Sequence, residues 1–186
     1  MVELSPYAGR SAWSHRLPAA ALGAAGFVIA GYLALFQLGS VTSVWDPVFG
    51  DGSVQVLRSP LASALPVPDA ALGAVGYLLE AVLLLAGGRA RWRDRPWLVI
   101  VGALLVAAMA AGGVVLVVVQ VAVLGTGCTL CLVSATISLV IAALAMPEAA
   151  ATVSHLRDER RPAIDAPMPD RALAPRSAAA RIHDQS

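Results

Sequence analysis

The sequence predicts an all-α, polytopic membrane protein, in which four transmembrane helices form a bundle and a long extracytoplasmic loop joins helices 1 and 2. Hydrophobic residues make up 58% of the 186 residues, charged residues make up 13%, and the mean hydropathy is +0.75. Such values are typical of chains whose main solvent is the lipid bilayer. The net charge is +1, and the arginines are scattered at segment ends, which argues against a nucleic-acid partner.

Four apolar stretches are long enough to cross the hydrocarbon core of a bilayer, which takes about 20 helical residues. They are Leu17 to Gly39, Asp69 to Gly87, Trp97 to Leu124 and Cys128 to Met146. The first is longer than the ~7 to 15 apolar residues of a signal peptide, so we expect it to stay as a membrane anchor. The chain then divides into a cytoplasmic N-terminal segment (1–16), a four-span membrane domain (17–146) and a C-terminal tail (147–186).

The tail beyond Met146 is expected to be disordered. Its prolines are interspersed with Ala, Arg and Asp, and no apolar period is sustained. A short helix from about Ala149 to Arg161, with its basic end on anionic lipid, is the alternative.

The arginines predict which side of the membrane each connection faces. They lie before the first span, between the second and third spans, and after the fourth span, whereas the connections Ser40 to Pro68 and Gly125 to Gly127 hold only Arg58. Cytoplasmic loops of membrane proteins carry the excess of Lys and Arg. We therefore expect a multi-pass protein of the cell membrane with both termini in the cytoplasm and with these two connections on the outer side.

The two cysteines, Cys128 and Cys131, open the fourth span and are therefore expected on the outer side. At the first turn of a helix, unpaired backbone N–H groups and the macrodipole favour a thiolate. A spacing of three residues places both side chains on one face of the helix. Because disulfide chemistry normally takes place outside the cytoplasm, this pair is the candidate catalytic dithiol.

Two other interpretations of the cysteine pair were weighed. A structural zinc site needs four ligands, and the histidines, His15, His155 and His183, lie in predicted cytoplasmic segments, so we expect no metal. A purely structural disulfide would close a very short loop, which removes little entropy from the unfolded chain and adds little stability. Thiol exchange is the interpretation that we favour.

Four polar side chains interrupt the apolar spans. Gln37, Asp69 and Gln120 are expected at about the depth of the cysteines, and Glu80 near the middle of the membrane. Polar groups in lipid are costly unless they are partnered, so a polar pocket around the cysteines is expected. Each of these residues also has a purely structural explanation. Asp69 could cap its helix, and the two glutamines could form interhelical hydrogen bonds. Glu80 could be a neutral, protonated structural group.

Three motifs accompany the cysteine pair. They are Trp45-Asp46-Pro47 with Phe49-Gly50 in the outer loop, Pro68-Asp69-Ala70-Ala71-Leu72-Gly73 with Tyr77 in the second span, and the Cys-x-x-Cys that opens the fourth span. Together with the four-span topology, they resemble the vitamin K epoxide reductase family over Leu17 to Met146. The outer loop is long, as functional loops are, and we expect it to lie as a lid on the bundle; anchoring of its aromatics at the lipid headgroups is the alternative.

The resemblance implies a bundle around a quinone of the menaquinone or ubiquinone type, with the Cys-x-x-Cys cycling between dithiol and disulfide. Cys131 would face the quinone ring, and Cys128 would exchange with the electron donor, a thioredoxin-fold protein outside the cytoplasm. Asp69 would hydrogen-bond a quinone carbonyl. The other candidate quinone-binding residues are Leu72, Tyr77 and Trp45, which the resemblance implies, and Gln120, which lies at the same depth.

The outer loop lacks the second cysteine pair that relays electrons in many members of that family. Either a partner's thiolate attacks Cys128 directly, or this chain does not relay thiol electrons. A tyrosine found shortly after the Cys-x-x-Cys in some relatives is replaced here by Ala135, and Asp69 stands where relatives carry Asn. A carboxyl group donates to a carbonyl only when it is protonated.

The sequence thus favours a membrane thiol–quinone oxidoreductase linked to disulfide formation. The alternative is a non-catalytic membrane scaffold or assembly factor derived from the same bundle, which the missing loop cysteines favour. A transporter or channel accessory subunit is indicated only by the small residues Ala107, Gly112 and Gly113, which more often mean tight helix packing.

Overall fold

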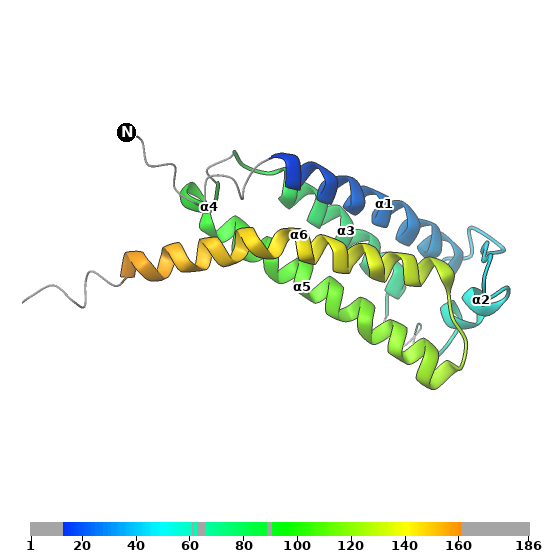
Figure 1. Cartoon of the computed structure of the whole chain (residues 1–186). Coiled ribbons are helices and arrows are strands. Elements are labelled where there is room, and N and C mark those ends of the chain that lie inside the picture. The colour runs from blue at the N-terminus through cyan, green and yellow to red at the C-terminus, as the bar shows by residue number, and fades with distance from the viewer. Residues whose placement is uncertain (1–12, 61, 63–65, 89–90, 161–186) are drawn as a thin grey trace, which may run out of the picture.

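The computed structural model describes residues 13–60, 62, 66–88 and 91–160, and every regular element in this part of the chain is a helix (Figure 1). This confirms the predicted all-α class. The long helices are α1 (Trp13–Gln37), α3 (Asp69–Leu85), α5 (Pro96–Val119) and α6 (Thr129–Arg160). The short ones are α2 (Gly52–Leu57), α4 (Arg91–Asp94) and the π-helical turn η1 (Gln120–Leu124).

The four long helices form a closed bundle. Helix α1 packs against α3 and α6, and helix α5 packs against the same two helices. Figure 1 shows α2 at one end of the bundle, where α6 begins, and α4 at the opposite end. The outer loop of the sequence prediction is therefore at the same end as the two cysteines.

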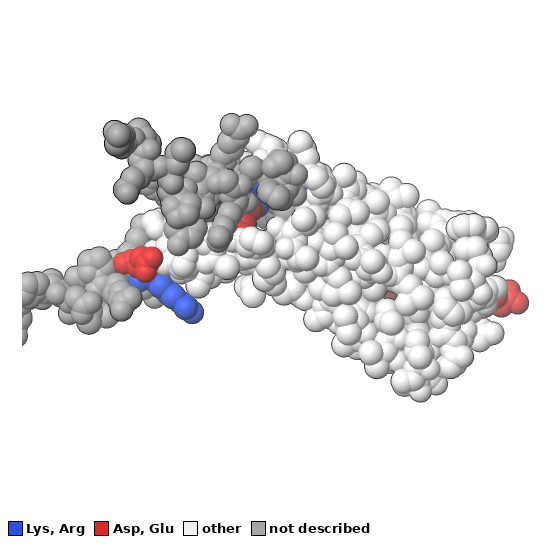
Figure 2. All heavy atoms as spheres, in the orientation of Figure 1, with Lys and Arg blue, Asp and Glu red and all other residues white. Residues whose placement is uncertain are grey.

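Three helices of the described chain are long and apolar enough to cross a membrane: Arg16–Gln37, Pro96–Leu124 and Thr129–Asp158. Helix α3 has 17 residues, or about 26 Å at 1.5 Å per residue, so it is the shortest of the bundle. Figure 2 shows a broad face almost free of charged atoms between the two ends of the molecule. Apolar side chains are exposed along these helices, among them Val28, Leu79, Leu104 and Val118.

Small residues let the helices approach closely. An added Cβ on Gly26 of α1 would come within 2.6 Å of the Tyr77 ring of α3, and one on Gly113 of α5 would lie 3.2 Å from Ala135 of α6. Interfaces between membrane helices are enriched in such residues because they allow backbones to pack together. Gly113, weighed above as a transporter feature, therefore serves helix packing.

Helix α6 differs from the expected span, because it continues without a break from Thr129 to Arg160. The expected span ends at Met146, followed by a disordered tail or by a short helix from about Ala149 to Arg161. Proline inside a helix costs about 3 kcal/mol, yet Pro147 lies within α6. Residues 161–186 of the expected tail lie outside the described part of the chain.

The continuation of α6 coincides with a buried ion pair next to Pro147. Glu148 accepts two hydrogen bonds from the Arg91 guanidinium, from Nε at 2.7 Å and from an Nη at 2.6 Å. One turn later, the Thr152 hydroxyl donates to the Glu148 carbonyl at 2.9 Å. The Arg91–Glu148 pair joins α6 to α4, which is a contact that the sequence pattern alone does not reveal.

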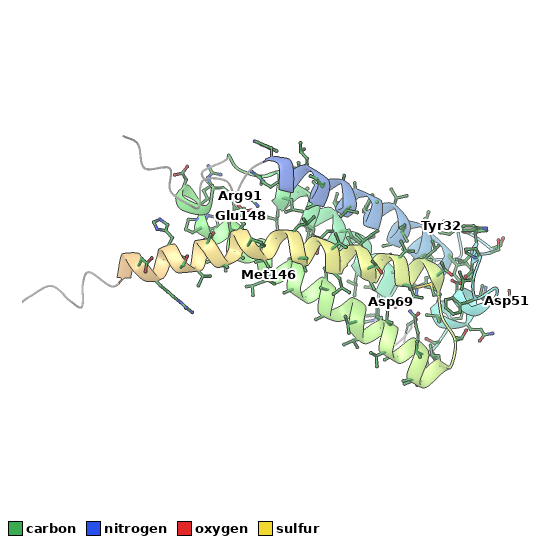
Figure 3. The ribbon with its side chains drawn as sticks, viewed as in Figure 1. Tyr32, Asp51, Asp69, Arg91, Met146 and Glu148 are labelled. Atoms are coloured by element: carbon green, nitrogen blue, oxygen red, sulfur yellow. A yellow bond between two sulfur atoms is a disulfide. The ribbon has the colours of Figure 1, made fainter. Side chains whose placement is uncertain are left out.

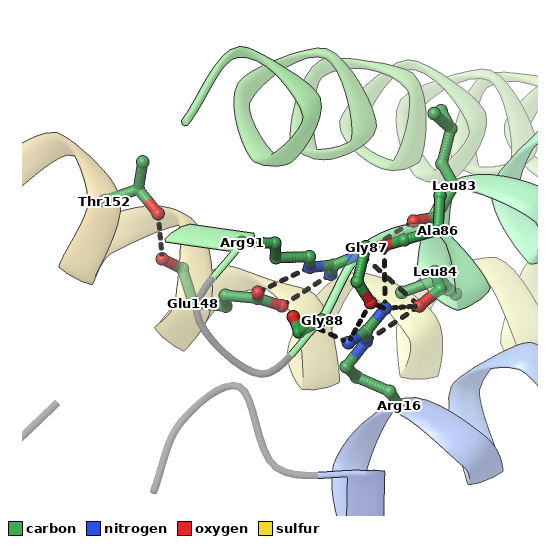
Figure 4. A network of polar contacts seen from close by, with 9 residues as sticks. All are labelled: Arg16, Leu83, Leu84, Ala86, Gly87, Gly88, Arg91, Glu148 and Thr152. Carbon is green, nitrogen blue, oxygen red and sulfur yellow. Dashed lines mark hydrogen bonds and ion pairs between the residues drawn. The ribbon is translucent and has the colours of Figure 1, made fainter. Parts of the chain in front are cut away.

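Two buried arginines cap the end of α3 (Figure 4). Arg16 of α1 donates to the carbonyls of Leu84 at 2.8 Å and of Ala86 at 2.8 Å, and Arg91 donates to the carbonyl of Leu83 at 2.7 Å. The last carbonyls of a helix have no partner within the helix, and positive charge there complements the macrodipole. Figure 3 shows Arg91 and Glu148 at the end of the bundle remote from Asp69.

Candidate functional site

Cys128 and Cys131 form a disulfide at the beginning of α6. Cys128 immediately precedes the helix, and its sulfur accepts a hydrogen bond from the backbone N–H of Cys131 at 3.1 Å. This is the contact of an N-cap side chain with the third helical residue. The backbone N–H of Cys131 is therefore the donor that would stabilise a negative charge on the Cys128 sulfur.

The π-helical turn at the end of α5 positions the segment that leads to the cysteines. The Gln120 side-chain oxygen accepts the backbone N–H of Cys128 at 3.2 Å, and the Gln120 carbonyl accepts the N–H of Thr126 at 3.2 Å. Gly125 closes the turn with a φ of 62°, a conformation that glycine adopts without strain. Gln120 thus holds the backbone of Cys128 and does not line the cavity described below.

The outer loop covers Cys128, which has 0% of its surface exposed. Cys128 belongs to an apolar cluster with Leu33 and Phe36 of α1, with Val44 of the loop, and with Val56 and Leu57 of α2. The Phe49 ring lies so close to Gly127 that an added Cβ would be 2.7 Å away from it. We call residues Val44 to Leu57 the cap. A thiol from water reaches Cys128 only after the cap moves.

Asp46 fastens the cap to the first turn of α6. Its carboxylate accepts the Ser53 hydroxyl at 2.5 Å, the backbone N–H of Thr129 at 3.2 Å and the Thr129 hydroxyl. It also accepts the N–H groups of Val48 and Phe49 at 3.0 and 2.9 Å, which shapes the loop itself. One carboxylate therefore joins two segments that are 83 residues apart in the sequence.

Burial raises the pKa of the Asp46 carboxyl, but hydrogen bonds from Ser53 and Thr129, and from the backbone N–H of Phe49, outweigh it and hold the pKa well below its usual range. A depressed pKa in the folded protein means that the carboxylate stabilises the cap at every pH above the unfolded value of about 4. That stabilisation is lost only as the pH falls through the lower folded value. The cap should therefore stay in place in mildly acidic solution.

Replacing Asp46 by asparagine is expected to release the cap. The asparagine amide replaces one carboxylate oxygen by an NH₂ group, which cannot accept a hydrogen bond from Ser53 or Thr129. A hydrogen bond to a charged group contributes about 1.5–3 kcal/mol, and this contribution is lost. The Cys128–Cys131 disulfide should then be reduced at least about tenfold faster by a small water-soluble thiol, as measured by alkylation of the freed cysteines. Asp51→Asn, an exposed change in the same loop, is the control; equal rates for both variants would contradict the role of Asp46.

Beside the disulfide, the bundle forms a cavity of about 240 Å³. Cys131 lines it, together with Ser134 and Ser138 further along α6. The walls are otherwise mostly apolar and come from all four long helices and from α2: Ala30, Leu33, Leu57, Ala70, Leu72, Gly73, Met109, Gly112 and Leu116. Ligand pockets of proteins share this mixture of apolar walls and a few placed polar groups.

Three of the predicted quinone-binding residues line this cavity beside Cys131: Asp69, Leu72 and Tyr77. Asp69 is the first residue of α3, and its carboxylate accepts the Gln37 side-chain amide at 2.5 Å and the N–H of Ala70 at 2.8 Å. Pro68 is the N-cap residue of α3 and, among the described residues, no side chain caps this helix, so the capping alternative for Asp69 is wrong, although its carboxylate lies in the first turn. Trp45 differs from the prediction, because it is 69% exposed and is absent from the cavity wall.

Tyr77 points from α3 to α6 across the cavity. Its hydroxyl donates to the Ser134 carbonyl at 2.5 Å and lies 2.8 Å from the Ser138 hydroxyl oxygen. Sequence reasoning did not single out Ser134, Ser138 or the carboxylate of Asp46 as site residues. Serines within an apolar span gave a weak signal, because such hydroxyls commonly bond their own helix.

Among the described residues, no three His, Cys, Asp or Glu side chains lie together as metal ligands would. The arrangement is suited to thiol chemistry next to an apolar ligand: a disulfide at a helix start, an adjacent cavity and a cap over one of the two cysteines.

The comparison with known families agrees with these features. The model of the vitamin K epoxide reductase family matches residues 17–146, which include both cysteines, the cap and all residues of the cavity wall. No curated protein matches the sequence. Since the match covers well over half of the 186 residues, the chain belongs to the vitamin K epoxide reductase family.

Proposed function

We propose that this protein is a membrane thiol–quinone oxidoreductase, in which the Cys128–Cys131 pair passes electrons from a protein thiol to a lipid-soluble quinone. The observation that carries the proposal is the position of the disulfide between two environments. Cys131 lines the apolar cavity, while Cys128 lies beneath the cap. Membership of the family supports the same chemistry.

The cavity suits the ring of a quinone. Its volume of about 240 Å³ is slightly below the ~300–1,000 Å³ of pockets that enclose a drug-sized ligand. The ring would occupy the cavity, and the isoprenoid tail would lie in the bilayer along exposed side chains of its rim such as Leu72 and Leu116. Asp69 and the Tyr77 hydroxyl are the polar groups that would orient the ring carbonyls.

The electron balance needs no further cofactor. A donor dithiol reduces the Cys128–Cys131 disulfide by exchange at Cys128 and becomes a disulfide itself. The resulting Cys128–Cys131 dithiol then gives two electrons to the quinone, which takes up two protons and becomes a quinol, while the disulfide forms again. The donor would be a thioredoxin-fold protein outside the cytoplasm, and the attack on Cys128 would take place after the cap opens.

The proposed orientation follows from charge. The capping arginines Arg16 and Arg91 lie at the α4 end of the bundle, which would face the cytoplasm together with both termini, and the two connections expected outside hold only Arg58. The cysteine end would then face the outside, with α3 completing four passes. Gln120 would act by holding the Cys128 backbone, and Trp45 would lie at the lipid headgroups or against the donor protein.

A direct test uses the purified full-length protein in lipid nanodiscs. The cysteine pair is reduced with a thiol, the thiol is removed, and a short-tailed ubiquinone or menaquinone analogue is added under anaerobic conditions. We expect one quinol to form for each disulfide regenerated, measured by absorbance and by alkylation of the remaining thiols. A pair that stays reduced in the presence of both quinones would contradict the proposal.

The scaffold alternative makes the opposite prediction. It is favoured by the full burial of Cys128 and by the absence of cysteines in the outer loop. It requires that the disulfide stay oxidised in cells and that its removal leave the partner proteins unaffected. Trapping of the redox state by rapid alkylation in living cells distinguishes the two, since an enzyme in turnover shows a reduced fraction that grows when quinone is depleted.

A further inference from the structure

Glu80 is a buried carboxyl group that the proposed function does not use. It lies in α3 with 1% of its surface exposed, and neither of its carboxyl oxygens has a hydrogen-bond partner among the described residues. Leaving such a group unpaired in an apolar interior costs several kcal/mol unless it is neutral or meets water. An unpartnered carboxyl at this depth therefore requires an explanation beyond packing.

A small cavity gives Glu80 access to a polar neighbour. The cavity has a volume of about 20 Å³ and is lined by Glu80, Arg91 and Glu148 together with apolar side chains. A water molecule needs about 10–15 Å³ of such volume and two or more polar partners, so the cavity can hold one. That water would link the Glu80 carboxyl to the Arg91–Glu148 ion pair at the α4 end of the bundle.

Tyr77 is the residue of α3 between Glu80 and the large cavity, which Glu80 itself does not line. Tyr77 lies three residues before Glu80 on the same face of α3, and its hydroxyl contacts Ser138 and the Ser134 carbonyl. Tyr77, Ser134 and Ser138 all line the cavity that holds Cys131. The Ser134 hydroxyl is itself buried without a hydrogen-bond partner among the described residues, as expected of a group that awaits a ligand.

Charged side chains of three other helices lie at the end of α3 that follows Glu80. Arg16 of α1 and Arg91 of α4 both donate to the carbonyl of Leu84, one turn after Glu80. The nearby acidic group is Glu148 of α6, which is paired with Arg91. Helix α5 presents apolar side chains to the small cavity, among them Leu98, Val99 and Val106. These arginines donate to backbone carbonyls and to Glu148, and neither donates to the Glu80 carboxyl.

We infer that Glu80 is a proton-binding site that delivers one proton to the quinone through the Tyr77 and Ser138 hydroxyls. This inference rests on the proposed function. In the step, one cysteine thiol and one cysteine thiolate give two electrons to the quinone as their S–S bond forms. One proton comes from the thiol and the other from the Glu80 carboxyl, which yields the neutral quinol. Glu80 then regains its proton through the small cavity at the α4 end.

The test measures single-turnover quinol formation by the reduced full-length protein in nanodiscs, as a function of pH and in D₂O. Glu80→Gln keeps the size of the side chain but carries no exchangeable acid. We expect it to slow the electron-transfer step by about a hundredfold, the usual contribution of a general acid, and to change the pH profile so that only the rise with thiolate formation remains, while the quinone concentration for half-saturation stays the same. Glu80→Asp, which keeps the acid, should recover part of the rate.

Asp94→Asn is the matched control, because Asp94 is an exposed carboxyl in α4, and it should behave as the wild type. Equal rates and pH profiles for Glu80→Gln and the wild type would overturn the inference and leave the proposed function intact. If the wild type forms no quinol, the proposed function fails, and infrared difference spectroscopy decides about Glu80. The carboxyl band of Glu80 is the one that the wild type shows and Glu80→Gln lacks. This band must change when the disulfide is reduced, and an unchanged band overturns the inference.

Discussion

Replacing Glu148 by leucine is expected to destabilise the protein by about 3–5 kcal/mol, the usual cost of removing one partner of a buried ion pair. Both side chains are almost fully buried, at 5% exposure for Arg91 and for Glu148. The change leaves the Arg91 guanidinium in the bundle with only backbone carbonyls as partners. Because the pair joins α4 to α6, the part of α6 beyond Pro147 should also lose helical order.

Thermal unfolding in detergent micelles, followed by circular dichroism, measures this effect. Asp158→Leu makes the same chemical change at an exposed position of α6, and it should leave the midpoint nearly unchanged. The double variant Arg91→Met with Glu148→Leu should recover part of the loss, since it removes both charges. A Glu148→Leu protein that unfolds at the wild-type temperature would show that the ion pair contributes nothing to stability.

Replacing Cys131 by serine is expected to reduce quinone reduction to the uncatalysed background. Cys131 is the cysteine that lines the cavity, so under the proposed function its sulfur would meet the ring, and a serine hydroxyl cannot form a disulfide. The Cys128→Ser variant should also fail to turn over, but for a different reason. Its remaining thiol still faces the cavity and can add to the quinone ring, which gives a stable thioether on the resulting hydroquinone.

The two cysteine variants are therefore distinguished by their products. Incubation with the quinone analogue, followed by intact-protein mass spectrometry, should show one added quinone on the Cys128→Ser protein and none on the Cys131→Ser protein. Thr136→Ser, an exposed substitution one turn further along α6, controls for general perturbation of the helix and should turn over normally. The reverse pattern, with the adduct on Cys128, would mean that the cavity serves the other sulfur.

Local patterns in the sequence account for much of this protein. Apolar stretches of sufficient length predict helices that lie in a membrane, and the described chain contains α1, α3, α5 and α6 close to the expected positions. The position of Cys128 and Cys131 at a helix start could be predicted because the apolar stretch begins there. The motif at Pro68 to Gly73 likewise indicated the beginning of α3 and a polar group at Asp69.

Contacts between distant residues could not be predicted in this way. The packing of distant segments brings together residues that are 57 to 83 positions apart in the chain. These pairs are Asp46 with Thr129, Tyr77 with Ser134, and Arg91 with Glu148. Hydropathy is a property of one segment, and it does not say which face of a helix meets which neighbour. The sequence could therefore name Gln120 and Trp45 as site residues by depth or motif, although neither lines the cavity.

The sequence alone thus determined the helical class and the position of the two cysteines, because both are encoded in hydropathy and spacing within short segments, and its motifs carried the resemblance to the family. Only the tertiary structure decided that the cap buries Cys128 while Cys131 borders a cavity, and that α6 extends beyond Pro147 to Arg160. The physical reason is that burial, cavity shape and ion pairing depend on the register of packed helices. A single Cβ would collide with the Tyr77 ring at Gly26 and with the Phe49 ring at Gly127, and no local pattern records either contact.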